Sequence, residues 1–293
     1  MTDHLALALA LRLTTLASTG VLVLLIVAWA LAQGLPGGDQ LLYLTQPDIN
    51  NRARLILHDL RHDTHLPLPV ELIGWGLDAT WSPDGQAVAF TTFQPDAVRR
   101  DSPSWSPDGR YLAYQAIDSA AATGWDIYIH DLHTDTFEAV YVTPGMDGLP
   151  AWSPDGERLA FVGLDAASET YAILLLDVAS GELTPLLGLA EAGFNVPLAW
   201  SPDGAALVFS APLAFRNVNL YRIEIASGEM RQLTSGSSSP TEPDWSPGGE
   251  RLAFTSYHPQ GTDLRIYTMD ASGGSMTLIT PGTAGYRQPA WRP

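Results

Sequence analysis

One five-residue segment, Trp-Ser-Pro-Asp-Gly, recurs along this chain and sharply limits the folds open to it. The segment or a close variant begins at Trp81, Trp105, Trp152, Trp200 and Trp245, and a further tryptophan, Trp291, stands two residues from the end. Successive tryptophans are 24, 47, 48, 45 and 46 residues apart. A repeat of this length, rich in short strand-like runs, is typical of a β-propeller or a solenoid.

Each repeat carries the pattern of four short strands. The first strand ends in Pro-x-Trp at Trp105, Trp152, Trp245 and Trp291. The Ser-Pro-Asp-Gly turn follows it within a repeat, with proline and glycine at the positions where a tight turn prefers them. The second strand is apolar on both faces, as at Leu159-Ala160-Phe161, which indicates burial between neighbouring blades. In three repeats an Ala-Ser-Gly turn then joins a third strand to a fourth. We therefore predict an all-β fold, a β-propeller.

The repeated WSPDG followed by LAF-like strands, and by a third strand such as Asp126-Ile127-Tyr128, resembles the TolB-type propeller repeat, which is related to WD repeats. The resemblance extends over roughly residues 40–293. It implies six blades. It implies little about function, because similar propellers serve as periplasmic scaffolds and as binding domains of peptidases.

The two ends of the repeat region complement each other. The last strand, 288–291, looks like the first strand of a blade with no partners after it, whereas 41–44, 55–59 and 66–68 look like a blade that lacks its first strand. We predict that together they form one blade, which closes the ring and leaves no open edge. Counting it gives six blades. Only 24 residues separate Trp81 from Trp105, so we expect one blade to be truncated or the ring to have effectively five and a half blades.

The amino-terminal segment is apolar enough to enter a membrane. Residues 13–32 carry no charge and would span roughly 30 Å as a helix. We predict a membrane anchor or signal segment at 1–33, a linker at 34–39 and the propeller at 40–293. A retained anchor is favoured, and secretion after cleavage near Ala32 is the alternative. Either way the propeller lies on the extracytoplasmic side, periplasmic or at the cell surface.

Charge and composition exclude several functions. The chain has 15 basic and 32 acidic residues, a net charge of −17, and no lysine or cysteine. An acidic surface repels polyanions, so we predict no nucleic-acid partner. The missing residues exclude disulfides, thiolate zinc sites, cysteine nucleophiles and lysine Schiff bases. A basic protein surface or a divalent cation fits the charge better.

The repeated motif residues are expected to be structural. We predict that the turn aspartates stabilise hairpin tips and that the tryptophans pack between blades: Trp81, Asp84, Trp105, Asp108, Trp152, Asp155, Trp200, Asp203, Trp245 and Trp291. Five histidines cluster near third-to-fourth-strand turns, at His58, His62, His65, His130 and His133, and we interpret them as surface turn residues. We predict no catalytic residue, no cofactor and no metal site.

The two rims of the ring differ in sequence. Regular turns lie at one rim, whereas the loops at the other are longer and vary between repeats, which is where a repeat protein specialises. Aromatic and arginine side chains, the usual anchors of protein interfaces, occur in these loops. The candidate partner-binding residues are Trp75, Arg99, Arg100, Trp125, Phe194, Phe215, Arg216, Tyr257 and Arg287.

We predict from this asymmetry a protein-binding or scaffold module. It would be tethered to the lipid bilayer through residues 13–32 and act as an accessory subunit of an envelope or membrane protein complex. One alternative is a small-ligand or metal-dependent enzyme or sensor that uses the propeller channel. The other is a subunit whose propeller is mainly structural within a larger membrane assembly.

Overall fold

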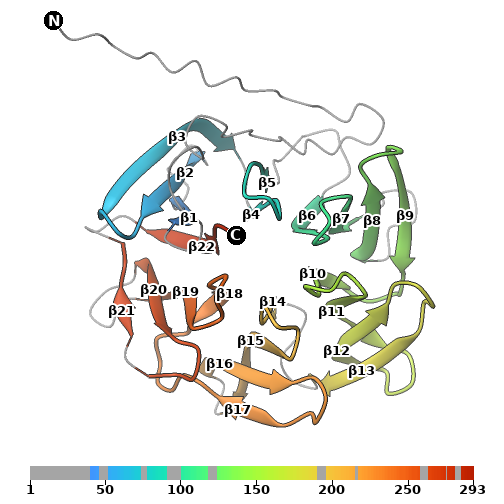
Figure 1. The fold of residues 1–293 in the computed structure, drawn as a ribbon. Coiled ribbons are helices and arrows are strands. Elements are labelled where there is room, and N and C mark those ends of the chain that lie inside the picture. Colours follow the sequence, from blue (N-terminus) through green and yellow to red (C-terminus); the bar gives the residue numbers. More distant parts are fainter. Residues whose placement is uncertain are drawn as a thin grey trace, which may run out of the picture.

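The strands form a ring of sheets around a central channel, and the carboxyl terminus lies near its centre (Figure 1). This is a computed structural model. It describes residues 40–45, 52–73, 78–90, 100–117, 124–189, 196–214, 217–257, 263–274, 276–280 and 285–293. No helix in these ranges is long and apolar enough to cross a membrane. The predicted anchor and linker, 1–39, lie outside the described residues.

Five of the sheets have four antiparallel strands each, which we label a to d from the channel outwards. The closing blade contains β22 (Tyr286–Trp291), β1 (Gln40–Thr45), β2 (Arg52–Asp59) and β3 (Thr64–Ile73). The next complete blade contains β6 (Arg100–Trp105), β7 (Tyr111–Ala116), β8 (Asp126–Asp131) and β9 (Thr136–Tyr141). It is followed by β10 (Gly148–Trp152), β11 (Arg158–Asp165), β12 (Thr170–Asp177) and β13 (Leu183–Gly188).

The remaining two complete blades follow in chain order. One contains β14 (Leu198–Trp200), β15 (Ala206–Ala214), β16 (Asn217–Glu224) and β17 (Met230–Gln232). The other contains β18 (Thr241–Trp245), β19 (Arg251–Tyr257), β20 (Leu264–Asp270) and β21 (Thr277–Leu278).

The predicted count of six blades needs correction. The described residues form five complete blades, and between the closing blade and β6 there is only a two-stranded sheet, β4 (Ala79–Trp81) and β5 (Val88–Phe90). The reason is length: the interval of 24 residues between Trp81 and Trp105 has room for an a and a b strand but is too short for four strands. Residues 91–99, which come after β5, lie outside the described residues.

The predicted closure of the ring is present. Strand β22, from the end of the chain, pairs antiparallel with β1, with Leu41 opposite Trp291 and Leu42 opposite Ala290. Strand β1 also pairs with β2, so the strands of this blade come from both ends of the repeat region. An a strand from one end therefore seals the edge that the b strand from the other would expose.

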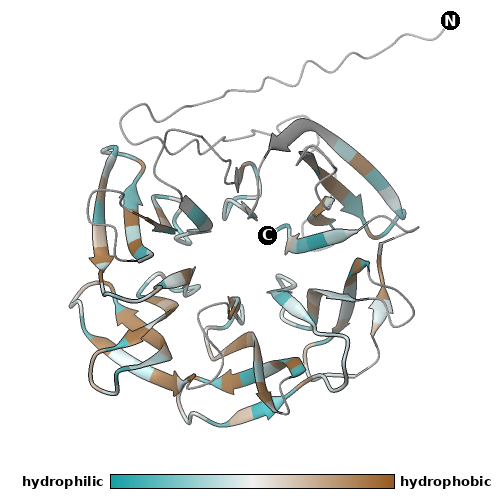
Figure 2. Cartoon of the chain, turned by 180° about the vertical axis from the view of Figure 1, so that it is seen from behind, coloured by the Kyte–Doolittle hydropathy of each residue, from teal (hydrophilic) through white to brown (hydrophobic). Residues whose placement is uncertain are grey.

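The core lies in the b and c strands, between neighbouring sheets. The middle of each complete b strand is buried, and Tyr43, Phe161, Phe209 and Phe254 are among the largest fully buried side chains. Hydrophobic residues concentrate in these middle strands, whereas the strands beside the centre include polar stretches (Figure 2). This difference in hydrophobicity follows from the positions of the strands. A b strand contacts a blade on each side, whereas an a strand has one edge on the channel.

Candidate functional site

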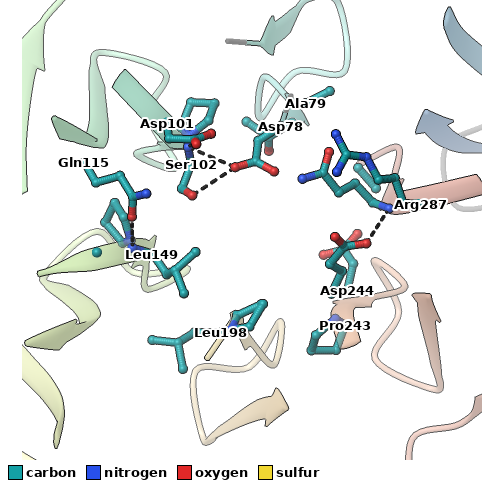
Figure 3. Close-up of a pocket in the computed structure, with 18 of the residues that line it drawn as sticks. Asp78, Ala79, Asp101, Ser102, Gln115, Leu149, Leu198, Pro243, Asp244 and Arg287 are labelled. Carbon is teal, nitrogen blue, oxygen red and sulfur yellow. Dashed lines mark hydrogen bonds between the residues drawn. The ribbon is translucent and has the colours of Figure 1, made fainter. Parts of the chain in front are cut away.

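The a strands surround a cavity of about 600 Å³ in the central channel (Figure 3). Its walls are the first residues of each a strand, such as Asp101 to Pro103 and Glu242 to Asp244, together with Gln115 and Trp125 beside a b–c loop. The b–c and d–a loops meet at one rim of the ring, which we call the mouth face. The opposite rim, with the a–b and c–d turns, is the turn face. The cavity therefore lies toward the mouth face.

Four a strands carry the same backbone distortion where they line the cavity. The residue before the strand proline adopts a left-handed conformation in each of them: Ser102 (φ 53°), Leu149 (φ 59°), Glu242 (φ 53°) and Gln288 (φ 54°). The pairing register of each strand shifts at this point. Left-handed residues other than glycine store strain, and bulges of this kind turn side chains away from the regular alternation of a strand.

The bulge in β18 places two carboxylates at the cavity wall. Glu242 accepts hydrogen bonds from Oγ1 of Thr255 (2.6 Å) and from the backbone nitrogen of Gln288 (2.8 Å). Asp244 accepts one from the backbone nitrogen of Trp291, at 2.6 Å. Burial raises the pKa of Glu242, and it raises the pKa of Asp244 to about 7. Asp244 can therefore change charge near neutral pH.

Three further aspartates line the opposite wall. Oδ2 of Asp78 accepts hydrogen bonds from the backbone nitrogen (3.0 Å) and the hydroxyl (2.9 Å) of Ser102. Asp147 is fully buried and accepts from the hydroxyl of Thr143 and the backbone nitrogen of Leu164. Burial raises the pKa of Asp147. Asp101, also buried, completes the set.

Arg287 is the single basic residue among the described residues that line the cavity. Its Nε and Nη2 groups are buried and have no hydrogen-bond partner within the described part of the chain. A buried donor without a partner costs free energy until something accepts its hydrogen bond. Among the described residues, the lining thus combines the donors of Arg287 with five carboxylates, which suits a ligand with both basic and carbonyl groups.

The structure brings together only some of the predicted partner-binding residues. Trp125 and Arg287 both line the cavity, and Tyr257, at the end of β19, is exposed. Arg100 begins β6. The other five candidates lie outside the described residues: Trp75, Arg99, Phe194, Phe215 and Arg216.

The motif residues lie on the turn face and between the sheets. In each WSPDG turn the serine hydroxyl donates to the aspartate, as Ser153 does to Asp155 (2.5 Å), and the aspartate also accepts from the backbone two residues on. The same pattern holds at Asp84, Asp108 and Asp203. Trp200 donates through Nε1 to the carbonyl of Ala151 in the preceding blade, and Trp81 and Trp245 make the equivalent bond.

The interpretation of the histidines as surface residues needs correction at two positions. His58 and His130 are buried, because each lies on a c strand and faces the interior of its sheet packing. His62 and His133 occupy the turns, and His65, on the d strand, is partly buried against His58.

Comparison with known proteins agrees with this architecture. The family model for the TolB beta propeller domain matches residues 100–212 and 167–293. The chain belongs to the TolB β-propeller domain family.

Two solved structures illustrate how far the likeness extends. TolB from Acinetobacter baumannii is 19% identical, with a TM-score of 0.58, and the match covers 89% of this chain and 69% of that one. A putative TolB from Agrobacterium tumefaciens is also 19% identical, with a TM-score of 0.63 over 84% of this chain and 90% of that one. At this identity the likeness concerns the fold.

Sequence reasoning missed the cavity carboxylates, although a signal for them is present in the repeat itself. An acidic residue stands one to three positions before the Pro-x-Trp segment in several repeats, as Asp101, Asp147 and Glu242 do. In so acidic a chain, single carboxylates carry no information. Their recurrence near the start of the a strand, around a common cavity, is the informative pattern.

Proposed function

We propose that this propeller is a protein-binding module whose mouth face receives a partner segment that carries basic residues. The observation that carries the proposal is the cavity lining, in which the described residues place five carboxylates and one arginine around about 600 Å³ at the entrance to the channel. Such a surface attracts a positively charged segment over a distance of roughly a Debye length. Arg287, whose two donors lack partners within the described residues, is available to a backbone carbonyl of that segment.

The mouth-face loops supply the anchors for such a partner. Trp125 at the cavity wall and the exposed Tyr257 are aromatic residues of the kind that contribute most to protein interfaces. We include in the same surface the candidates outside the described residues, Trp75, Arg99, Phe194, Phe215 and Arg216, together with Arg100. Their loops differ in length and sequence from repeat to repeat, as partner-specific loops do.

We further propose the cellular setting that the amino-terminal segment favours. Residues 13–32 tether the chain to a bilayer, and the propeller works on the extracytoplasmic side as an accessory subunit of a membrane protein complex. Its partner is a protein. A nucleic acid is disfavoured, because the net charge of −17 and the acidic channel both repel a polyanion.

The test is recovery of partners from detergent-solubilised membranes with the full chain as bait. We compare wild type with Trp125→Ala, Arg287→Ala, Trp75→Ala and Phe215→Ala. Ser227→Ala is the matched control, because Ser227 lies in a c–d turn on the turn face. We expect a truncated central aromatic to cost about 2 kcal/mol of binding or more, with an unchanged melting temperature. Equal recovery by all variants would contradict the proposal. Loss of recovery in the Ser227→Ala control alone would mean that the partner binds the turn face and not the mouth face.

A second candidate function is a small-ligand enzyme or sensor in the same cavity. It is favoured by Glu242, Asp244 and Asp147, which line the same cavity, because carboxyl groups with a raised pKa are common at ligand and reaction sites. The two functions differ in the occupant of the cavity. The enzyme or sensor function would be favoured if the purified chain bound a small cationic metabolite. Asp244→Asn should then abolish that binding while the recovery of protein partners stays intact.

A further inference from the structure

The hairpin between β2 and β3 departs from its counterparts in the other blades at one cross-strand pair. In the closing blade His58 lies directly opposite His65. The equivalent pairs are His130 and Phe137, Leu176 and Leu183, and Ile223 and Met230. The d-strand position that His65 occupies is therefore apolar in the three other blades that carry this pair.

The other histidine of the pair has a structural explanation. The turn after it needs a left-handed residue, which is Gly181 (φ 72°) and Gly228 (φ 69°) in two blades. Asp63 (φ 50°) and Asp135 (φ 54°) take that position in the other two. In both cases the c-strand histidine meets the aspartate, with Nε2 of His130 3.0 Å from Oδ1 of Asp135. A contact between histidine and aspartate thus stabilises the left-handed conformation of the aspartate in the turns that lack glycine.

This explanation does not extend to His65, since the matched position of the His130 hairpin is Phe137. The rings of His58 and His65 lie 3.9 Å apart between centroids. Oδ1 of Asp63 is 3.0 Å from Nε2 of His58 and 3.7 Å from Nε2 of His65. One ligand atom from each of the three residues lies within 4.8 Å of the others.

We propose that His58, Asp63 and His65 bind a divalent transition metal, with Zn²⁺ as the ion that fits best. Zn²⁺ takes imidazole and carboxylate ligands at about 2.0–2.1 Å in a tetrahedron, so neighbouring ligand atoms stand about 3.3 Å apart. The separations of Asp63 Oδ1 from the two Nε2 atoms, 3.0 and 3.7 Å, lie on either side of that value. Imidazole ligands disfavour Ca²⁺ and Mg²⁺, which prefer oxygen.

The surroundings suit a metal site that is open on one side. Asp63 has 86% of its side chain exposed while His58 has 2%, so an ion can enter from solvent and settle against a buried ligand. The hydroxyl of Tyr43 lies 2.7 Å from Nδ1 of His65. A hydrogen bond to the second ring nitrogen orients a metal-binding histidine and leaves Nε2 for the ion.

The site would stabilise the blade in which the two ends of the repeat region meet. Tyr43 belongs to β1 and packs edge-on against Tyr286 of β22, with 5.4 Å between ring centroids. Bound Zn²⁺ would connect the c–d hairpin, through His65 and Tyr43, to the strands that close the ring. We therefore expect the metal to raise the stability of this blade rather than to serve the cavity on the mouth face.

The test measures Zn²⁺ binding to the full chain, purified in detergent and treated with a chelator. We expect one equivalent bound by wild type, with at least tenfold weaker binding by His65→Phe, which copies the residue of the matched hairpin. Tyr43→Phe removes only the orienting hydroxyl and should weaken binding severalfold. His133→Ala, in the matched turn, should bind as wild type does. Saturating Zn²⁺ should raise the melting temperature of wild type and not of His65→Phe.

The metal-free melting temperature of each variant shows whether its fold is intact, and Tyr43→Phe provides a second measure if His65→Phe is unstable. Equal Zn²⁺ affinity in wild type and His65→Phe would overturn the proposal. Absence of binding to wild type at 100-fold molar excess of Zn²⁺, or an equal loss in His133→Ala, would overturn it too.

Discussion

Nη1 of Arg292 donates a hydrogen bond to Oε1 of Gln40, 2.8 Å away and 252 positions earlier in the chain. The same guanidinium donates through Nε to the carbonyl of Gly85 (3.2 Å) and lies over the ring of Trp81. Arg292 is buried. One side chain therefore connects both strands at the closure to the sheet β4–β5, which has the fewest strands of the sheets formed by the described residues.

We predict that Arg292→Ala destabilises the propeller by about 2 kcal/mol or more. The substitution removes two charge-assisted hydrogen bonds and leaves buried acceptors without a donor. The free energy of unfolding from urea titration measures the effect. Arg231→Ala, on the exposed strand β17, is the control and should change stability by less than about 0.5 kcal/mol. Similar values for the two variants would mean that Arg292 does not contribute to closure.

The closure and the four-strand repeat could be predicted from the sequence because they depend on local patterns. A proline favours the turn that follows the tryptophan of each repeat. A run of residues that is apolar on both faces of the strand, as at Leu159 to Phe161, identifies a b strand buried between sheets. The unpaired a strand that ends at Trp291 indicated closure without any contact information. These signals lie within a few residues of one another.

The cavity and the histidine cluster could not be predicted in the same way. The carboxylate of Glu242 reaches the channel because its backbone is left-handed before a proline, a conformation that residue preferences disfavour. The meeting of His58 with His65 depends on the register between β2 and β3, which a one-residue slip would have abolished. The number of complete blades depended on the segment after β5, where the sequence has no apolar run.

The turn aspartates should matter for stability and not for metal binding. We predict that Asp155→Ala and Asp203→Ala each cost on the order of 1 kcal/mol, because each loses its bonds to a serine hydroxyl and a backbone nitrogen. Thermal unfolding with and without Ca²⁺ measures this. Glu157→Ala, in the same turn, is the control. A Ca²⁺-dependent rise in melting temperature that either aspartate substitution abolishes would contradict a purely structural role.

Stability should fall as pH rises because of Asp244. Its pKa is raised to about 7 by burial, so the folded state holds this proton more tightly than the unfolded chain does. The resulting stability is complete below about pH 4, where unfolded aspartate titrates, and is lost as pH rises through about 7. Asp244→Asn imitates the neutral form and should be insensitive to this loss.

The measurement is the difference in unfolding free energy between Asp244→Asn and wild type at pH 5 and pH 8. We expect it to grow in favour of the variant by on the order of 2 kcal/mol, since solvent in the cavity reduces the full value of about 1.4 kcal/mol per pKa unit. Taking the difference cancels other titrating groups, such as His58. A constant difference across this range would show that Asp244 is ionised throughout.

The same ionisation gives the last prediction, which concerns the charge of the mouth face. Above pH 7 the wild-type cavity carries an additional negative charge at Asp244, so a basic segment should associate faster there than at pH 5. We expect an arginine-rich synthetic peptide to bind the full chain with an association rate that falls as salt rises from 50 to 500 mM, because a Debye length of about 10 Å at 0.1 M shortens with salt. A glutamate-rich peptide of the same length should not bind.

Stopped-flow measurements with a labelled peptide give the rates, and two variants that each remove one carboxylate locate the effect. Asp244→Asn should slow association at pH 8 and weaken the dependence on pH, because it removes one of the charges at the cavity wall. Glu250→Gln removes an exposed charge from a turn on the opposite face and should leave the rate within about twofold of wild type. If the two variants slow association equally, the peptide senses the net charge of the chain, and the cavity is not its binding site.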